Sequence, residues 1–446
     1  MKEGKSMNKI IVSKFGGSSM SEASHVIKAA EVVKSNPLRR YVVISAPGKS
    51  SGSELGITDM LYLCYSQYRG NEDPSAMLER IRACFAGIVE GLGIDYSVDG
   101  VISSIRGYLS SGKSAAFIAS RGEYVMAGIF AQYIGWEMID AAEIIRFRND
   151  DSVDEEETFR LAGERLLNTN HAVIPGFYGA LPDGDIRTFQ RRAGDITGGL
   201  ITRATGAQIF EKWNCSKEIW SADPEVIDDP EIVRYLTYSE AMELNYIGIK
   251  TTHDEVISIL RPTGTSINIR SISDSEDPGT IIAETIPEGS RKNVAVCIGG
   301  RKGFSIIHIE KYALNKEMGF GEKLFGIFAR YCIPCEHCLS GIYKMSVVLK
   351  SPLYALRRKE VMAALKEALN ISSIDEEKNL SLITVVGDGM GTAYGTFERV
   401  FSSLNGAGIK ARMIDQGSDN LNIILGVRDE DYNTAIKALY KGMIIS

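Results

Sequence analysis

A lysine, two glycines and two hydroxyl residues stand directly after an apolar segment near the start of the chain. The run Lys14–Ser19 reads Lys-Phe-Gly-Gly-Ser-Ser and follows Ile10–Val12. This pattern predicts a buried strand that ends at the lysine, turns on the glycines and enters a helix. Glycines let backbone amides approach a phosphate, a helix start adds positive potential, and lysine supplies a mobile charge. The run therefore suits a phosphate that is being transferred.

The run does not match the common nucleotide-binding fingerprints. It lacks the Gly-x4-Gly-Lys spacing of a Walker loop and the Gly-x-Gly-x-x-Gly spacing of a dinucleotide-binding fold. A Gly-Gly turn after a strand is also most often only a turn. The phosphate interpretation therefore depends on the rest of the chain.

Three cysteines and a histidine form a second cluster, at Cys332, Cys335, His337 and Cys338. Their spacing imitates metal ligands, but a structural zinc site usually needs two separated pairs, and the sequence has no second pair. The same segment is typical of an amphipathic helix that runs into a strand. We interpret these cysteines as packing residues, with metal or redox chemistry as the alternative.

Length and composition exclude several classes of protein. A chain of 446 residues predicts two to four domains. The net charge of −7 argues against a general nucleic-acid binder. No apolar run approaches the roughly 18 residues that span a bilayer, and the polar N-terminus lacks a signal-peptide core. The odd number of cysteines fits a reducing compartment, so we expect a cytoplasmic protein without membrane or nucleic-acid partners.

Short apolar runs alternate with helical patterns up to about residue 285. Predicted strands lie at Tyr41–Ser45, Ala172–Phe177 and Gln208–Phe210, and a helical pattern covers Ser239–Tyr246. Such alternation predicts an α/β sandwich around a mainly parallel sheet. Ligands of these sheets bind at the carboxyl ends of the strands, where the loop after Lys14 is expected.

An internal repeat with an offset of 76 residues begins at about residue 293. The matching positions are Gly319 with Gly395, Gly341 with Gly417, and Ser346–Leu349 with Asn422–Leu425. Each copy reads strand, helix, strand, strand, helix, strand, which predicts a small α+β unit with an antiparallel sheet. Two such units after a catalytic-looking domain suggest regulation by a small ligand.

Five motifs occur in the order found in one known family. They are Lys14–Ser19, Ser45–Lys49 leading to Ile57–Asp59, Ser120–Glu123, Gly176–Gly179 and Met413–Gly417. On these motifs the chain resembles the aspartokinases of the amino acid kinase superfamily over nearly its whole length. The resemblance implies a three-layer α/β sandwich around a mainly parallel sheet, followed by two α+β, ferredoxin-like ACT modules. The implied bounds are 7–288 for the catalytic domain and 293–372 and 378–446 for the two modules.

The resemblance implies transfer of the ATP γ-phosphoryl group to the side-chain carboxylate of L-aspartate, with Mg²⁺ as the metal. The product is 4-phospho-L-aspartate, at the first step of the lysine, threonine and methionine pathway. Lys14, Gly16 and Gly17 are implied to contact the phosphates, and Lys250 matches a family lysine on the same group. Because charge accumulates on the transferring oxygens, two flanking cations make a sensible clamp.

The resemblance also supplies residues for the amino-acid substrate. Arg191 matches the arginine that grips the α-carboxylate, and Glu123 matches the acid that receives the ammonium group. Ser18 and Ser19 are expected to orient the substrate, to cap the following helix, or to do both. Asp195 is implied to orient the active-site lysines, with a magnesium-bound water as the alternative. No protein ligand for the metal is assigned.

Two loops depart from the family pattern. The family's Gly-Arg-Gly-Gly-Ser-Asp appears as Gln190–Asp195, with Arg192 and Ala193 in place of the glycine pair. If either glycine takes a positive φ, a side chain there costs roughly 1–2 kcal/mol.

The nucleotide segment has changed more. Thr-Asp-Val-Asp-Gly is replaced by Asn214–Glu218, and Glu225 stands where an arginine is common. Asn214, Cys215 and Trp220 are the expected nucleotide contacts of this segment.

Regulation is predicted in the first repeat. Met318, Gly319 and Phe320 are expected to form a loop beside Glu336 and Ser340, where backbone groups hold an effector's carboxylate and Glu336 receives its ammonium. By resemblance the effector is lysine, alone or together with threonine. ACT modules pair at such sites, so a homodimer or a dimer of dimers is expected.

Three hypotheses follow for the function. The first is an aspartate kinase under feedback control, or a paralogue that acts on an aspartate-like amino acid. The second is a catalytically weak amino-acid-sensing homologue, motivated by Arg192, Cys215 and Glu225. The third, a nicotinamide dehydrogenase, rests on Val296–Gly300 alone and lacks the required spacing.

Overall fold

The structure is a computed structural model that describes residues 10–49, 54–189, 194–215, 219–417 and 420–445. The chain divides into two compact units. The N-terminal unit comprises Met1–Ile219, Arg234–Tyr238 and Thr251–Pro287, and the C-terminal unit comprises Trp220–Val233, Ser239–Lys250 and Glu288–Ser446. The predicted bounds of the catalytic domain and of the two modules stay predictions.

A mainly parallel sheet forms the centre of the N-terminal unit. Its strand order is β3-β4-β2-β1-β7-β9-β10-β8, and only the β9–β10 pair is antiparallel among these described strands. The strands are β1 Ile11–Phe15, β2 Arg39–Ile44, β3 Glu137–Met138, β4 Ala172–Pro175, β7 Ile209–Asn214, β8 Tyr235–Thr237, β9 Ser266–Ser271 and β10 Thr280–Ala283. A separate hairpin pairs β5 Tyr178–Ala180 with β6 Ile186–Thr188. The strands predicted near residues 41, 172 and 208 are confirmed as β2, β4 and β7.

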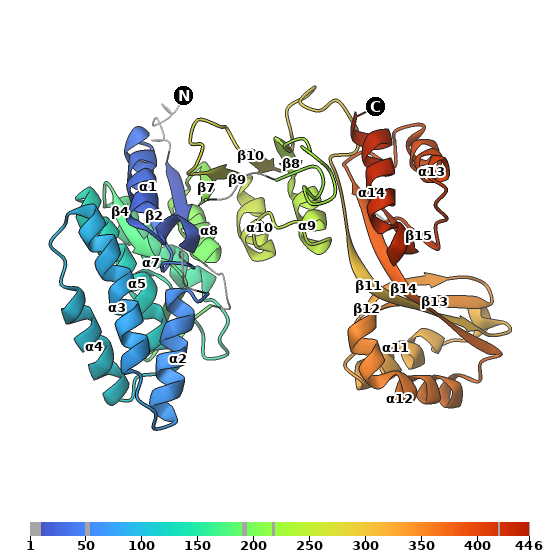
Figure 1. Cartoon of the computed structure of the whole chain (residues 1–446), viewed down its shortest axis with the longest axis horizontal. Coiled ribbons are helices and arrows are strands. Elements are labelled where there is room, and N and C mark those ends of the chain that lie inside the picture. Colours follow the sequence, from blue (N-terminus) through green and yellow to red (C-terminus); the bar gives the residue numbers. More distant parts are fainter. Residues whose placement is uncertain (1–9, 50–53, 190–193, 216–218, 418–419, 446) are drawn as a thin grey trace, which may run out of the picture. The chain divides into compact units, whose positions relative to one another are not determined.

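Helices cover both faces of this sheet (Figure 1). They are η1 Gly17–Met20, α1 Ala23–Ser35, α2 Ile57–Arg69, α3 Ser75–Leu92, α4 Val98–Ser110, α5 Ala115–Ile134, α6 Ala141–Ile144, α7 Glu155–Leu167, α8 Gly194–Thr205, α10 Asp254–Leu260 and η2 Arg261–Thr263. Alternate residues of β2 show the two faces, because Val42 packs with the α1–α5 helices while the Tyr41 hydroxyl donates to the Leu166 carbonyl of α7. The three-layer sandwich is therefore confirmed.

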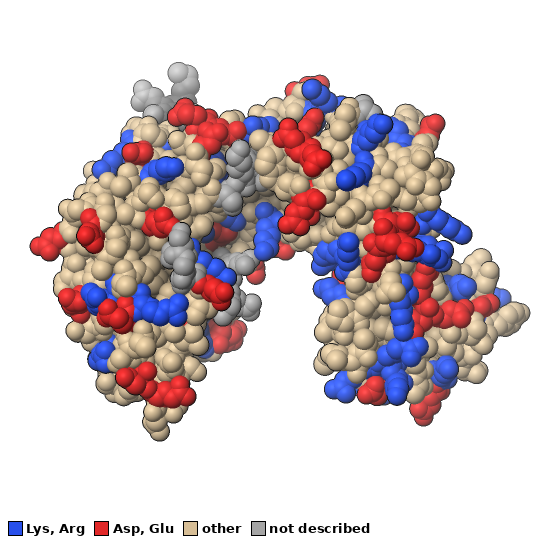
Figure 2. Space-filling view, in the orientation of Figure 1, with Lys and Arg blue, Asp and Glu red and all other residues tan. Residues whose placement is uncertain are grey.

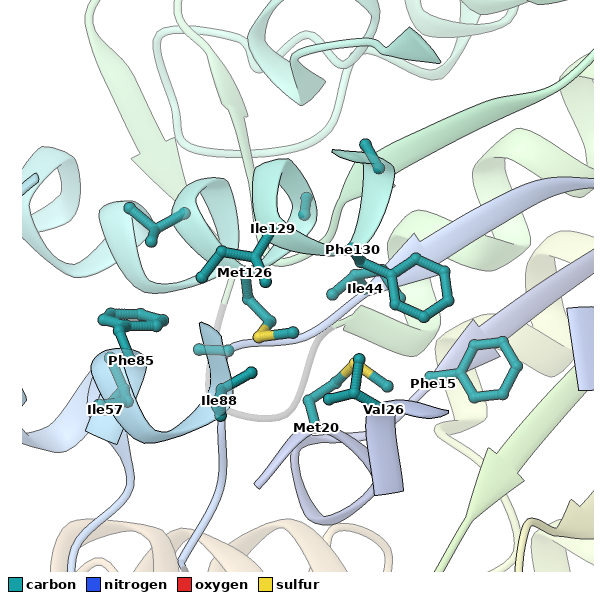
Figure 3. Close-up of a cluster of buried hydrophobic side chains, with 14 of the residues drawn as sticks. Phe15, Met20, Val26, Ile44, Ile57, Phe85, Ile88, Met126, Ile129 and Phe130 are labelled. Atoms are coloured by element: carbon teal, nitrogen blue, oxygen red, sulfur yellow. The ribbon is translucent and has the colours of Figure 1, made fainter. Parts of the chain in front are cut away.

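The core on the α1–α5 side joins elements that are far apart in the sequence. Phe15, Ile44, Phe85 and Phe130 come from β1, β2, α3 and α5 and meet in one buried cluster (Figure 3). All five residues of β1 are buried, as expected for a central strand covered on both faces. This core fixes the carboxyl end of β1, where Lys14 lies.

The C-terminal unit is built on one antiparallel sheet with the strand order β12-β13-β11-β14-β16-β15. Its strands are β11 Cys297–Glu310, β12 Cys335–Ser340, β13 Lys344–Lys350, β14 Ser373–Val386, β15 Met413–Asp415 and β16 Asn422–Arg428. Its helices are α9 Tyr238–Tyr246, η3 Leu314–Lys316, α11 Phe320–Arg330, α12 Ser351–Leu369, α13 Thr396–Gly406, η4 Asp429–Asp431, α14 Tyr432–Tyr440 and η5 Lys441–Ile445. On the face shown in Figure 2, acidic and basic side chains are interspersed on both units.

The internal repeat is present in the backbone. Gly319 and Gly395 precede α11 and α13 with φ angles of 77° and 78°, which favour glycine. The second copy departs from the predicted pattern, because its last residues, Lys441–Ile445, are helical rather than a strand. Its fourth strand is the first part of β11, where Cys297 pairs with Val386 of β14. The long strands β11 and β14 thus join the two copies in one sheet.

This sheet curls until its two edges meet. The strands β12 and β15 stand at opposite ends of the strand order, yet Nδ1 of His337 lies 2.9 Å from Oδ2 of Asp415. Apolar side chains that include Phe304, Leu382 and Met413 pack together on one face. Helix α11 ends at Arg330 before β12 begins at Cys335, as predicted for the cysteine-rich segment. No group of three metal-ligating side chains occurs among the described residues.

Two excursions of the N-terminal half of the chain pack within the C-terminal unit. The Tyr440 hydroxyl lies 3.2 Å from the Ser221 hydroxyl and accepts from the Glu231 amide at 2.9 Å. Arg291 forms an ion pair with the fully buried Glu240 at 2.5 Å. These contacts tie residues 220–233 and 239–250 to the C-terminal sheet. In the described part of the chain, no helix is both long and apolar enough for a membrane span.

Candidate active site

Lys14 lies near the end of β1, in the middle of the large sheet. Its neighbours in the sheet are Val43 of β2 and Lys212 of β7, each directly opposite in the register. The side chain of Lys14 is buried, with 8% exposed. A buried ammonium is costly unless an anion accompanies it, so its partner decides its role.

That partner is Asp195, in the first turn of α8. Oδ1 of Asp195 lies 2.6 Å from Nζ of Lys14, and Oδ2 lies 2.8 Å from Nζ of Lys212. Burial of the carboxyl opposes ionisation, but the charges of Lys14 and Lys212 outweigh it and hold the pKa of Asp195 well below its usual range. Asp195 is therefore an anion between two cations, Lys14 and Lys212. Its role in orienting active-site lysines stays a prediction, and Lys212 was not among the lysines expected there.

Lys212 is a residue that the sequence reasoning missed. Its ammonium also donates to the Thr251 carbonyl oxygen at 2.9 Å, which fixes its direction. The available signal was a lysine at the carboxyl end of a predicted strand, the same position that Lys14 holds in β1. Strand order was needed to use it, because only pairing of β1 with β7 brings the two lysines together.

Glycines leave room beside the Lys14 ammonium. A Cβ atom on Gly194 would lie 3.2 Å from Cε of Lys14, and one on Gly16 would lie 3.7 Å from its Nζ. A Cβ on Gly17 would lie 2.9 Å from the Ala46 carbonyl oxygen. The amide of Gly48 donates to the Gly17 carbonyl at 2.8 Å, so the loops after β1 and β2 interlock. Close backbone approach therefore favours glycine at Gly17 and Gly194, whereas a Cβ on Gly16 would make only ordinary contacts. We call the backbone of Gly16, Gly17 and Gly194 around the Lys14 ammonium the cradle.

The structure also places part of the nucleotide segment at this cradle. A Cβ on Gly16 would lie 3.5 Å from Oδ1 of Asn214, and Sγ of Cys215 lies 3.8 Å from Oγ of Ser19. Ser19 is buried and donates to the Trp213 carbonyl, whereas Ser18 is exposed. Neither serine caps a helix through its side chain, because the residues before η1 and α1 are Gly16 and Glu22.

A buried ionic network supports this end of β7 from the other face. Glu211 accepts two hydrogen bonds from Arg39, one from Ser13 and one from the indole of Trp213. The guanidinium groups of Arg39 and Arg270 lie 5.1 Å and 4.6 Å from the Trp213 ring centroid. Such cation–π contacts and charged hydrogen bonds fix the indole. The Trp213 carbonyl, which accepts from the Gly16 amide, is thereby held in place.

Glu123 lies on α5 and is buried. Burial raises the pKa of Glu123 to about 8, and hydrogen bonds from backbone and from the Thr58 hydroxyl, with the charge of Arg121, oppose this only in part. Its Oε2 atom has no hydrogen-bond partner among the described residues. An unpaired buried carboxylate oxygen is costly and is satisfied well by an ammonium group.

The structure does not place three of the predicted substrate contacts beside Lys14 and Asp195. Arg191, with the altered positions Arg192 and Ala193, lies outside the described residues. Trp220 and Lys250 belong to the C-terminal unit, where Trp220 forms a β-bridge with Ile232. Their roles at the nucleotide stay predictions.

The predicted effector residues lie around α11 and β12. Met318 is 95% exposed, Gly319 precedes α11 and Phe320 is buried in its first turn. Glu336 and Ser340 are on β12. The carboxylate of Glu336 is already paired, with Lys350 at 3.0 Å and Arg301 at 3.3 Å, and it accepts from the Tyr246 hydroxyl.

Comparison with known proteins identifies the family. A model of the amino acid kinase family matches residues 9–271, and a model of the ACT domain matches residues 383–443. The solved structure of aspartate kinase from Clostridium acetobutylicum is 33% identical, with a TM-score of 0.90 over 98% of this chain and 100% of that chain. The chain belongs to the aspartokinases of the amino acid kinase family.

Two further relatives also match this aspartokinase over nearly its whole length. Aspartokinase 3 of Bacillus subtilis strain 168 is 29% identical over 98% of this chain and 100% of the relative. Escherichia coli aspartokinase III, solved in complex with aspartate and ADP, is 21% identical, with a TM-score of 0.73 over 98% of this chain and 100% of that chain. At that identity the match supports the fold alone. The predicted fold class and family are thus confirmed.

Proposed function

We propose that this aspartokinase transfers the γ-phosphoryl group of ATP to the side-chain carboxylate of L-aspartate, giving 4-phospho-L-aspartate. The observation that carries the proposal is the Lys14–Asp195–Lys212 group beside the glycine cradle. Two lysines share one carboxylate, so the group keeps a net positive charge. Phosphoryl transfer needs such fixed charge, because negative charge spreads over the transferring oxygens.

Each element of the cradle has a part in this reaction. The Lys14 and Lys212 ammonium groups neutralise phosphate oxygens, and the backbone of Gly16 and Gly17 leaves space for the phosphate to approach. Asp195 fixes both ammonium groups before the substrate arrives, which avoids reorganisation during the transfer. The carboxylate of aspartate then attacks the γ-phosphorus in line with the departing ADP oxygen.

Glu123 and Arg191 complete the substrate side of the proposal. The buried Glu123 carboxylate receives the α-ammonium group of aspartate, and Arg191 holds its α-carboxylate. Because burial raises the pKa of Glu123 to about 8, the empty site keeps a proton on this group near neutral pH. Binding of the ammonium favours the ionised carboxylate, so aspartate binding releases a proton.

The residues present fit ATP and leave Mg²⁺ to the phosphates. The cradle beside Lys14 accommodates phosphate oxygens, and Asn214 is close enough to its rim to contact the nucleotide. Both oxygens of Asp195 are committed to lysines, so Asp195 is not a free metal ligand. Mg²⁺ when bound neutralises phosphate charge, and phosphate oxygens and water are its usual ligands.

A coupled assay of ADP release with ATP, Mg²⁺ and L-aspartate tests this function. We expect turnover that requires all three, and 4-phospho-L-aspartate trapped as its hydroxamate. Absence of turnover at about millimolar substrate, with ATP still bound in a titration, would favour a catalytically weak sensor. That second candidate is motivated by Cys215, which stands at the cradle in place of a family aspartate. Turnover with an aspartate analogue alone would favour a paralogue.

We also propose feedback regulation by lysine at the first ACT-like module, alone or together with threonine. Glu336 is paired with Lys350 and Arg301, and an amino acid bound there would exchange these ion pairs for contacts of its own ammonium and carboxylate with the three side chains. Glu336→Gln should raise the lysine concentration for half-maximal inhibition about tenfold, whereas Glu367→Gln on the exposed side of α12 should not. If lysine inhibits both variants at the same half-maximal concentration, Glu336 is not part of the effector site.

Pairing of the modules is proposed as a homodimer or a dimer of dimers. Large apolar side chains of the first module are exposed, including Tyr312 at 90% and Ile342 at 70%. Such surfaces are typical of interfaces. Light scattering of the full chain would give the assembly directly, and a monomer at all concentrations would exclude pairing. A cytoplasmic location is proposed as well, supported by seven free cysteines.

A further inference from the structure

A cavity of about 440 Å³ lies between α4 and α5 of the N-terminal unit. This volume falls in the range of about 300–1,000 Å³ that is typical of small-molecule sites. Arg121 on α5 lines the cavity, and Glu123 is only two residues further along the same helix. Two residues correspond to about 200° around a helix, so the cavity and the Glu123 carboxylate are on opposite sides of α5. The cavity is therefore separate from the proposed aspartate site.

The walls of the cavity combine rings and aliphatic groups. The residues of α4 that line it, including Val101, Ile105 and Tyr108, share one helical face, and Tyr124 and Val125 of α5 lie across from them. None of the described residues that line the cavity is acidic, and Arg121 is the one charged side chain among them.

The guanidinium of Arg121 is buried, and it forms no ion pair with any of the described residues. The residue is 8% exposed, and Nε and Nη2 donate to the hydroxyl of the adjacent Ser120. Among the described residues, no carboxylate oxygen lies within ion-pair distance of it. The rings of Phe117 and Tyr124 lie 4.4 Å and 4.5 Å from its central carbon. Aromatic rings orient a buried cation but compensate its charge only in part.

Glu123, two residues along α5, does not supply the missing charge. Glu123 interacts with Arg121 through space, but burial raises the pKa of Glu123 to about 8. Near neutral pH that carboxyl is largely protonated, so Arg121 remains a buried cation beside an open cavity. A polar group in this position is best satisfied by an anion from solution.

We propose that this cavity binds a small carboxylic acid with an apolar body about the size of one aromatic ring. Its carboxylate pairs with Arg121, and its body packs against Tyr108, Tyr124 and Val125. Arg121 is suited to the task because a guanidinium offers two parallel donors to a carboxylate. The proposal does not depend on the kinase activity, since the cavity and its cation belong to α4, to the two residues before it and to α5.

The shape of the cavity is set by small residues in the two helices. A Cβ on Gly128 of α5 would lie 2.9 Å from the Tyr96 hydroxyl, so glycine lets Tyr96 approach this helix. The Ser97 hydroxyl caps α4 by accepting from the Gly100 amide. The start of α4 is thus fixed against α5, and the cavity is formed before a ligand arrives. A preformed site loses less free energy to ordering on binding.

Benzoate and benzamide are matched probes for this site, because they differ mainly in charge. We expect calorimetry on the full chain to show benzoate binding at about millimolar affinity, as suits so small a ligand, and benzamide at least about tenfold weaker. Ser104 is an exposed residue of α4 that lines the cavity. The substitution Ser104→Phe should abolish benzoate binding, because the added ring fills the cavity. Ser103→Phe places the same ring beside the cavity and should leave binding unchanged.

Arg121→Gln tests the charge itself. This variant should remove the preference for benzoate over benzamide, and Arg121→Lys should keep part of it. If Arg121→Gln unfolds, the comparison of Ser104→Phe with Ser103→Phe still tests whether benzoate binds in this cavity. The proposal is overturned if benzoate does not bind, if it binds Ser104→Phe as well as the parent, or if aspartate at saturation displaces it. The last two results would place benzoate at another site.

Discussion

Lys14 and Lys212 stand directly opposite each other on the neighbouring parallel strands β1 and β7, and both ammonium groups contact Asp195. Adjacent strands are about 4.8 Å apart. Two ammonium groups this close repel each other, and the carboxylate between them makes their proximity stable. The arrangement therefore concentrates positive charge at one point, where a phosphate can bind.

Lys212→Met should lower kcat for aspartate phosphorylation by about 100-fold, the usual effect of losing one fixed donor at a developing charge. The methionine keeps the length and apolar stem of lysine, so KM for aspartate should change by no more than about threefold. Steady-state kinetics measure both constants. Lys28→Met, at an exposed position on α1, serves as the control. A Lys212→Met enzyme with the parent's kcat would remove Lys212 from the proposed clamp.

Asp195→Asn should destabilise the fold by about 3–5 kcal/mol, because it leaves two buried lysines without their anion. The double variant with Lys212→Met removes one of those cations and should recover part of the loss. Urea unfolding of the four proteins gives the free energies. Additive effects of the two substitutions would contradict a shared ion pair.

Glu123→Gln should remove a pH dependence of stability. In the unfolded chain Glu123 ionises near 4.5, whereas burial raises its folded pKa to about 8. The folded protein therefore holds one more proton between these values, and its free energy of unfolding falls as pH rises through this window. Relative to the parent, the free energy of unfolding of the variant should therefore rise by up to roughly 1.4 kcal/mol per pH unit from about pH 5 to 8.

Urea unfolding at about pH 5 and pH 8 measures this difference. Glu90→Gln, at an exposed position on α3, is the matched control and should follow the parent at both values. A constant difference between Glu123→Gln and the parent would show that the carboxyl is ionised throughout, in the empty site as well.

The sequence predicted the parts of the site that lie close together along the chain. The run Lys14–Ser19 carries its own signal, since a strand, two glycines and a helix start are adjacent. Lys212 carries only the signal of a lysine near the end of a predicted strand, and the use of that signal depends on which strands pair. The same holds for Arg121, whose neighbour Glu123 was recognised from a motif while the cavity across α5 requires the packing of α4.

The C-terminal unit shows a similar division. The offset between Gly319 and Gly395 predicted two copies of one pattern, and the backbone of both glycines confirms it. The sequence could not predict that the start of β11, at Cys297, would supply the missing strand of the second copy, since that pairing joins the beginning of the first copy to the beginning of the second. Long-range pairing depends on packing and leaves little local trace.

Gly17→Ala should impair the cradle without disturbing the rest of the sheet. Its Cβ would lie 2.9 Å from the Ala46 carbonyl and 3.1 Å from the Gly48 amide nitrogen, both backbone atoms that cannot turn away. We expect at least about a tenfold loss of kcat/KM for ATP, as the two loops separate. Gly87→Ala on α3 is the control, because its Cβ meets no atom within 4 Å and should stabilise the helix by about 0.5–1 kcal/mol. Normal ATP kinetics for Gly17→Ala would mean that the loops after β1 and β2 can move apart without impairing ATP binding or catalysis.

The contact between His337 and Asp415 should couple the two edges of the C-terminal sheet. A double-mutant cycle with alanine at each position should give a coupling free energy of about 1 kcal/mol, since the two atoms are 2.9 Å apart and the His337 side chain is mostly buried. The exposed pair Arg357 and Glu360 on α12, at 3.6 Å, is the control and should give about 0.5 kcal/mol or less. Urea unfolding supplies the four free energies of each cycle. Because β12 and β15 share no backbone pairing, a coupling no larger than that of the control would mean that the curl of the sheet is held by its apolar face alone, through side chains such as Phe304 and Met413.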